Sequence, residues 1–172
     1  MFVNFIEFNV FLTFCSYFSS LLGSDFVGGN LTSYKSQMPS STLGNLVKFE
    51  DVSSATGLSF NDERNVVIFK EDGIYLIISS GQVGSNSRGS SGWLDLWHIL
   101  NDISVQGSNN RTSISNSLDV ALMSTQSILN VKAGDRLSFG FSASGPTIGF
   151  MTYKPDREPV VSSINISIAK LK

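Results

Sequence analysis

Short apolar segments separated by turn residues recur along this chain, and they constrain its fold more than any other feature. About ten such segments lie between residues 46 and 171, and their turn signals have the roughly 8–12-residue spacing that is typical of an all-β sandwich. The clearest segment, residues 136–142 (RLSFGFS), alternates apolar and polar residues as a half-buried strand does. No helix of ordinary length is predicted after residue 22. The chain is therefore predicted to be an all-β protein.

The connections between these segments indicate two sheets rather than one. Several connections exceed two residues, which suits crossings between two sheets better than a simple meander. The expected strands are residues 46–49, 65–69, 74–83, 93–100, 103–105, 112–123, 127–131, 136–142, 147–153 and 160–171. We therefore predict a jelly roll or a similar β-sandwich over residues 43–172, preceded by a Gly/Ser-rich linker at 26–42 and an apolar N-terminal arm at 1–25.

The N-terminal arm (residues 1–25) is rich in phenylalanine. Its apolar residues fit a helical spacing and a strand alternation equally well, so their period does not decide between the two. The arm lacks the basic n-region of a signal peptide, and Asn4, Glu7 and Asn9 interrupt its apolar run, so no membrane-spanning helix is expected. We expect an arm that packs on a neighbouring subunit. An uncleaved signal sequence is the alternative.

The charge of the chain excludes one large class of partner. Twelve Lys and Arg residues stand against 14 Asp and Glu residues, which gives a net charge of −2, and no basic stripe or cluster is present. Nucleic-acid binding needs such a stripe, so no nucleic-acid partner is predicted. The single cysteine, Cys15, allows no internal disulfide, and its apolar neighbours favour a small buried side chain.

Nothing in the sequence forms a convincing catalytic or metal site. The one histidine, His98, has Asp95 and Asp102 nearby, but no G-x-S-x-G nucleophile motif accompanies it. His98 shares a strand face with Leu94 and Leu96, which favours a buried, hydrogen-bonded histidine. A lone histidine with one distant cysteine makes no zinc site, and the acidic pairs in the turns lack a calcium-loop spacing. No enzymatic activity, metal or cofactor is predicted.

Two motifs resemble those of C1q/TNF-like domains. Residues 69–76 (FKEDGIYL) resemble the family's F-x-x-x-D-G-x-Y-x-F entry to its second strand, and residues 124–137 (STQSILNVKAGDRL) resemble its S-x-x-x-x-L-x-L-x-x-G-D-x-V strand–turn–strand. The closing segment 162–171 (SSINISIAKL) looks like that of bacterial and phage members. The resemblance covers roughly residues 43–172 and implies a ten-stranded jelly roll that assembles as a compact trimer. No Gly-X-Y collagen repeat precedes it, which suits a viral or bacterial member better than complement-like or hormone-like roles.

The segment with both tryptophans is apolar on both faces. Trp93 and Trp97 share one face of this strand, and Leu94 and Leu96 share the other. We expect the leucines in the core and the tryptophans at a subunit interface, where aromatic residues are enriched; the alternative is that they cap an edge of the core. Small residues of the last strand are expected to allow close approach at a threefold axis. The predicted trimer interface consists of Trp93, Trp97, Asn165, Ser167 and Ala169.

Three polar loops, at residues 84–92, 106–111 and 154–159, each carry an arginine. Loops at the ends of a sandwich are where binding sites usually form. Arg88, Arg111 and Arg157 are therefore candidate contacts to a glycan or protein ligand, and solvated connectors are the plainer alternative.

These observations together favour a structural protein over an enzyme. We expect a non-enzymatic homotrimer on a virion surface, either a capsid decoration (cement) protein or the head of a fibre. Residues 1–25 would anchor it to capsid or other virion proteins. The alternative is a secreted, extracellular C1q-like recognition module that binds a carbohydrate or protein ligand through its loops.

Overall fold

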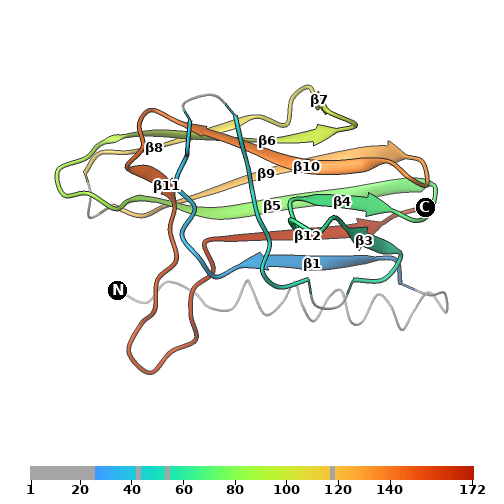
Figure 1. The fold of residues 1–172 in the computed structure, drawn as a ribbon, viewed down its shortest axis with the longest axis horizontal. Helices are drawn as coiled ribbons and strands as arrows, with labels where there is room; N and C mark the ends of the chain where they lie inside the picture. The colour runs from blue at the N-terminus through green and yellow to red at the C-terminus, as the bar shows by residue number, and fades with distance from the viewer. Residues whose placement is uncertain (1–25, 42–43, 53–54, 117–118) are drawn as a thin grey trace.

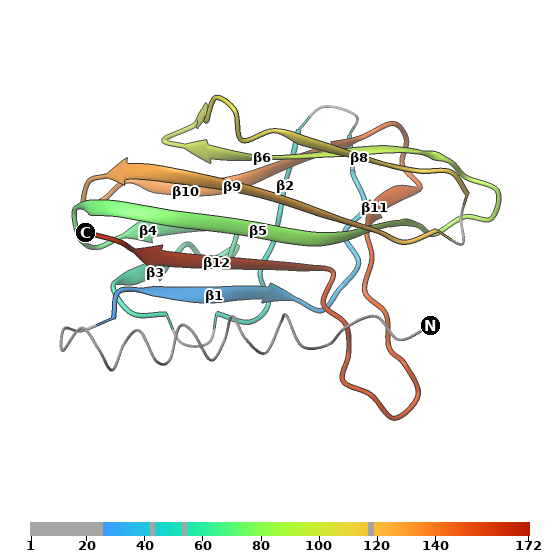
Figure 2. The same cartoon turned by 180° about the vertical axis from the view of Figure 1, so that it is seen from behind.

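The computed structural model of the chain describes residues 26–41, 44–52, 55–116 and 119–172. Throughout these ranges the regular elements are all β-strands, and they form two antiparallel sheets that pack face to face (Figure 1). The same two layers are seen from behind in Figure 2. The predicted all-β jelly-roll sandwich is confirmed, with twelve strands where about ten were expected. The N-terminal arm and Cys15 lie outside the described residues.

The first sheet is built around its longest strand, β5 (Gly73–Ser85). One edge of β5 pairs with β9 (Ala121–Val131). Its other edge pairs with β12 (Ile164–Lys170) and, further along, with β11 (Ile148–Phe150). Because β12 also pairs with β1 (Gly28–Ser33), the sheet runs in the order β1–β12–β5–β9 over most of its width.

The second sheet is built around β10 (Arg136–Ala143), which pairs along one edge with β6 (Gly92–Leu100). The other strands of this sheet are β2 (Asn45–Leu46), β3 (Leu58–Phe60), β4 (Val66–Phe69), β7 (Ile103–Ser104) and β8 (Asn110–Ile114). Strands β2 and β4 pair with the other edge of β10. Strands β7 and β8 pair with the edge of β6 that faces away from β10. Neighbouring strands are thus often distant in sequence, because the chain crosses repeatedly between the layers.

Alternating apolar residues from both sheets meet in one core. Leu137, Phe139 and Phe141 of β10 are at most 2% exposed, as their alternation in the sequence predicts. The rings of Phe141 and Phe150 pack edge to face across the two layers, with centroids 5.4 Å apart. Such aromatic pairs contribute about 1 kcal/mol beyond the area that they bury. The core therefore ties the sheets together without a disulfide within the described residues.

The predicted linker at 26–42 is wrong over part of its length. Residues 28–33 form β1, and Leu31 in this strand is fully buried. The apolar spacing of this segment is weak because Gly28, Gly29 and Asn30 leave Leu31 as its one large apolar side chain. Pairing with β12 supplies the partner that the local sequence does not reveal.

Candidate functional site

The outward side of the first sheet carries no charged side chain over four strands, and we call it the uncharged face. Its members alternate along each strand with residues that point into the core. They are Asn30, Thr32, Ile74, Leu76, Ile78, Ser80, Gln82, Leu122, Ser124, Gln126, Ile128, Asn130, Asn165, Ser167 and Ala169. In a chain with 26 charged residues, counted as 12 basic and 14 acidic, a face of this width without charge is a notable feature.

One half of the uncharged face is polar, and its polar groups bond to one another. Thr32 Oγ1 donates to Asn165 Oδ1 at 2.9 Å, joining β1 to β12. The hydroxyls of Ser80 and Ser124 lie 3.1 Å apart and join β5 to β9. These side chains satisfy each other across the strands, so covering them with another surface would cost less than covering free polar groups.

The other half of the uncharged face is apolar. The register sets Ile128, Leu76 and Ala169 side by side on β9, β5 and β12. On β9, Ile128 in this half is 67% exposed, and Leu122, opposite Gln82 near the other end of the strand, is 74% exposed. A contiguous exposed apolar patch is typical of a protein–protein contact.

The tryptophans lie on the outer side of the second sheet, where they form a compact cluster with β8. Arg111 Nε and Nη2 donate to the two carboxylate oxygens of Asp95, each at 2.7 Å. The guanidinium also stacks over Trp93, 3.9 Å from the ring centroid. The hydrogen bonds that Arg111 donates to Asp95 raise the pKa of Arg111 above its ordinary value. Trp97 lies directly on Gly140 of the neighbouring strand, where a side chain would collide with the indole.

The structure therefore does not bring the five predicted interface residues together. Trp93 and Trp97 belong to the second sheet, whereas Asn165, Ser167 and Ala169 belong to the first. The two groups face away from each other because the sandwich core lies between the sheets. The sequence gives the face alternation within each strand but not the sheet to which the strand belongs. The expected core positions of Leu94 and Leu96 are confirmed, since both are fully buried.

His98 is fully buried between the sheets, as the sequence predicts. Its Nε2 lies 3.0 Å from Ser79 Oγ of β5, and its Nδ1 lies 2.8 Å from Ser127 Oγ of β9. Burial lowers the pKa of His98 from 6.5 to about 4. Asp95 lies on the opposite face of β6 and Asp102 is exposed in the following turn, so no Ser–His–Asp arrangement forms. This geometry fits a structural histidine better than a catalytic one.

The three candidate arginines lie on separate segments. Arg111 is wrongly assigned to a loop, because it is the second residue of β8 and is held by Asp95 and Trp93. Arg88 is exposed between β5 and β6. Arg157 is exposed, with a positive φ of 68°, in the long loop between β11 and β12. This loop projects well beyond the sandwich in both ribbon views (Figures 1 and 2).

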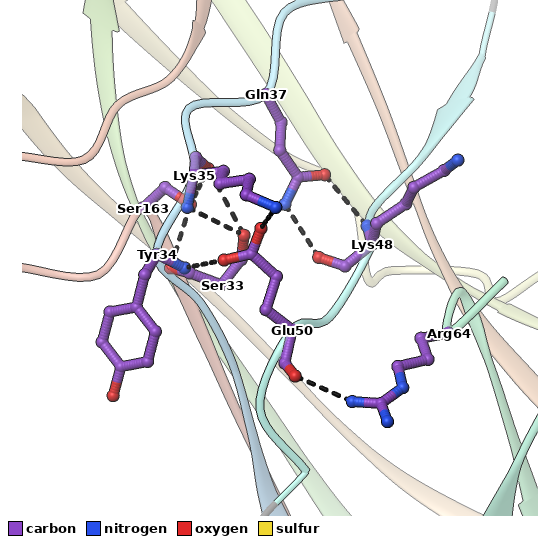
Figure 3. Close-up of polar contacts among 8 residues, drawn as sticks. All are labelled: Ser33, Tyr34, Lys35, Gln37, Lys48, Glu50, Arg64 and Ser163. Carbon is purple, nitrogen blue, oxygen red and sulfur yellow. Dashed lines mark hydrogen bonds and ion pairs between the residues drawn. The ribbon is translucent and has the colours of Figure 1, made fainter.

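A polar cluster that the sequence does not reveal holds the segment after β1, which leaves the first sheet, against the segment around Glu50 (Figure 3). The Glu50 carboxylate accepts a hydrogen bond from the backbone N–H of Tyr34 at 2.9 Å. It also forms an ion pair with Lys35 at 3.1 Å. Arg64 Nη1 donates to the backbone carbonyl of Glu50 at 2.8 Å. The side chain of Gln37 bonds both backbone groups of Lys48. No local motif marks these residues, since their contacts join residues up to 16 positions apart.

Neither metal ligation nor a membrane span is indicated in the part of the chain that the structure describes. It contains no group of three or more His, Cys, Asp or Glu side chains that could hold an ion. No helix there is long and apolar enough to cross a membrane.

The comparisons with known proteins are informative at the level of the fold. No family model matches the sequence, and no curated protein matches it. Among solved structures, the globular domain of the zebrafish complement 1qA protein superposes with a TM-score of 0.53 and is 12% identical in sequence. The alignment covers 86% of this chain and 98% of that domain. The chain has a C1q-like fold.

The resemblance noted in the sequence is thus supported at the level of the fold. At 12% identity, a C1q-like fold says nothing of which branch of the family the chain is near. The bacterial and phage likeness of its closing strand stays a prediction. The strand pairing of this chain places the members of the uncharged face in one sheet.

Proposed function

We propose that this chain is a non-enzymatic structural module that assembles as a homotrimer through its uncharged face. The observation that carries the proposal is the face itself, which carries no charged side chain and has an exposed apolar half around Leu76 and Ile128. Closed threefold rings need a heterologous contact, in which one patch meets a different patch on the neighbour. The uncharged face offers two separate patches, the apolar half around Leu76, Ala169 and Ile128 and the far end of β9 at Leu122.

The contact is tested by placing a charge on it. Ile128→Asp puts a carboxylate on a 67% exposed side chain, where it leaves the fold of the monomer intact. In an interface the same carboxylate would be buried without a partner, which is costly. Light scattering on the purified full chain should show a trimer for the natural sequence and a monomer for Ile128→Asp.

A matched control separates this effect from a general loss of apolar surface. Ile103 is 74% exposed on β7, in the other sheet, and Ile103→Asp should leave the trimer unchanged. A natural chain that is monomeric at micromolar concentration would refute the proposal. So would an Ile128→Asp variant that remains trimeric.

We further propose that the trimer is a component of a virion surface, a decoration protein or fibre head held by residues 1–25. Support comes from the low charge, the frequent Ser, Asn and Gly residues, and the apolar arm that precedes the sandwich. Deleting residues 1–25 should leave trimerisation intact and abolish attachment to particles, measured by co-sedimentation. If the full chain never associates with particles, this role is excluded while the trimer is not.

A secreted recognition module is the competing proposal. The exposed Arg88 and Arg157 at loop positions favour it, since loops of a C1q-like fold are free to vary without disturbing the core. A glycan-array signal that is lost in the Arg88→Ala, Arg157→Ala double variant would support it. Particle attachment through residues 1–25 without any such signal would support the virion role instead.

A further inference from the structure

A groove beside the β2 edge of the second sheet forms a hollow of about 500 Å³ that is distinct from the uncharged face. It lies between the segment that leaves β1 and the segment that contains β2. Its principal lining residues are Gln37, Met38, Asn45, Leu46, Lys48 and Phe141. The volume falls within the roughly 300–1,000 Å³ that small-molecule sites usually have.

The walls of this groove are held in place by side-chain amides. Gln37 Nε2 donates to the carbonyl of Lys48 and its Oε1 accepts from the N–H of Lys48, both at 2.9 Å. The backbone of Gln37 also bonds in both directions to Phe150 of β11, at 2.8 and 3.0 Å. Asn45 Oδ1 accepts from the backbone and hydroxyl of Ser40, each at 2.9 Å. A site with fixed walls loses little conformational entropy when it binds a ligand.

The lining combines side-chain amides and hydroxyls with two accessible apolar side chains and one positive charge. Met38 and Leu46 supply the apolar surface, and Leu46 is 39% exposed, whereas Phe141 is only 2% exposed. Lys48 is exposed, and within the described ranges its ammonium group forms no ion pair. The amides of Gln37 and Asn45 are already bonded, so Lys48 is the lining group with free capacity for a charged partner.

The neighbouring charged groups leave the Lys48 ammonium unpaired. In Figure 3, Lys35 pairs with the Glu50 carboxylate and Arg64 donates to the Glu50 backbone carbonyl, while the Lys48 ammonium points away from both. Glu50 is occupied by Lys35 and by the N–H of Tyr34, and so does not neutralise Lys48. Among the lining residues, Lys48 is therefore the one that presents an unpaired charge. This charge complements an anion.

We propose that this groove binds a small organic anion that has one carboxylate on an apolar body. The carboxylate meets the Lys48 ammonium, and the apolar body lies against Met38 and Leu46. A bare inorganic anion would leave the apolar lining unused, and a neutral apolar molecule would leave the ammonium unpaired.

The test compares two probes of equal shape, 4-phenylbutyrate and 4-phenylbutanol, with the full chain. Amide shifts in nitrogen-15 NMR spectra report where each probe binds. We expect 4-phenylbutyrate to shift the amides of Asn45, Leu46 and Lys48, with a dissociation constant of about 1 mM for a ligand of this size. The alcohol should bind at the same place about fivefold more weakly, which is the upper range for one exposed ion pair.

Variants assign the two parts of the site. Lys48→Gln should weaken the acid about fivefold and leave the alcohol unchanged, because it removes one exposed ion pair. Lys70→Gln removes a charge from another exposed lysine and should alter neither probe. Leu46→Ser should weaken both probes, because it removes apolar contact. The unperturbed remainder of each spectrum shows that the variant is folded.

Several results would overturn the proposal. If the acid and the alcohol bind with equal affinity, Lys48 has no role. The same holds if the acid binds equally well to the natural chain and to Lys48→Gln. Inorganic phosphate that shifts the same amides as strongly as 4-phenylbutyrate would remove the apolar part. Shifts confined to other regions of the sandwich, or no shifts at several millimolar acid, would exclude the site.

Discussion

At the scale of single residues, the most unusual group is a histidine sealed inside an apolar core. His98 packs against Phe139, with ring centroids 5.3 Å apart, and its two ring nitrogens each meet a serine hydroxyl. The strands packed around it, β5, β9 and β10, point no charged side chain at the ring. The neutral imidazole is therefore the stable form, and His98 fastens both sheets through polar contacts.

The stability of the fold should depend on pH through His98. Its folded pKa of about 4 lies below the ordinary 6.5, so the unfolded chain binds a proton first as the pH falls. Stability is complete above pH 6.5 and decreases toward pH 4, by about 2 kcal/mol between pH 7 and pH 5. Urea unfolding at several pH values measures this slope. His98→Gln, which does not titrate, should be less stable at pH 7 but lose less stability on acidification; an equal slope would contradict the prediction.

A second residue-scale prediction concerns Gln37. Its amide occupies the backbone groups of Lys48 as a neighbouring strand would, and so covers an open sheet edge. Gln37→Ala should lower the free energy of unfolding by about 1 kcal/mol and speed hydrogen exchange at the Lys48 amide. Gln106→Ala, at an exposed glutamine, is the matched control and should change neither quantity.

At the scale of elements, the sequence predicts strands best where each strand carries its own alternation. β10 is an example, because Leu137, Phe139 and Phe141 mark its inner face without reference to any partner. β1 escapes prediction because its burial comes from β12, more than 130 residues away along the chain. The expected strand at 112–123 is divided between β8 and β9 for a similar reason, since the two strands join different sheets.

The same limit applies to the candidate sites. Which side of its strand Trp97 occupies follows from alternation, but the sheet in which that strand lies depends on pairing with β8 and β10. The Lys48 groove depends on the amide of Gln37, 11 residues away, reaching a backbone. Contacts of this kind leave no periodic trace in the sequence.

The role of β1 is testable at the scale of this element. If residues 28–33 are part of the sandwich, Leu31→Ala should lower the free energy of unfolding by about 2–5 kcal/mol, because Leu31 is fully buried. Leu171→Ala, at a leucine that is 55% exposed, should cost less than about 1 kcal/mol. Urea unfolding of both variants gives the comparison. If both variants lose the same free energy of unfolding, residues 28–33 do not contribute to the sandwich and act as a linker.

At the scale of the whole molecule, the two sides of the sandwich have different character. The uncharged face carries no charged side chain, while the other sheet carries the Arg111–Asp95 pair and lies beside the groove at Lys48. Assembly through the first side would leave the second exposed. The proposed trimer and the proposed ligand site are thus compatible in one particle.

The proposed trimer should respond little to salt. Salt screens charges, and a contact built on the uncharged face has none to screen. We expect the dissociation constant of the trimer to change by less than about twofold between low and high sodium chloride, measured by analytical ultracentrifugation. A strong weakening with salt would place the contact on a charged surface elsewhere.

The pairing of β1 with β12 has a geometric consequence. Gly28 lies opposite Ala169, so the described chain begins and ends at the same end of the first sheet. In a threefold ring whose strands run along the axis, the first and last described residues of all three chains would lie on the same side. The two ends of the particle would then differ, so that one end could attach to a surface while the other end faces outward. A protein fused after Lys172 would share the end at which residue 26 enters the sandwich.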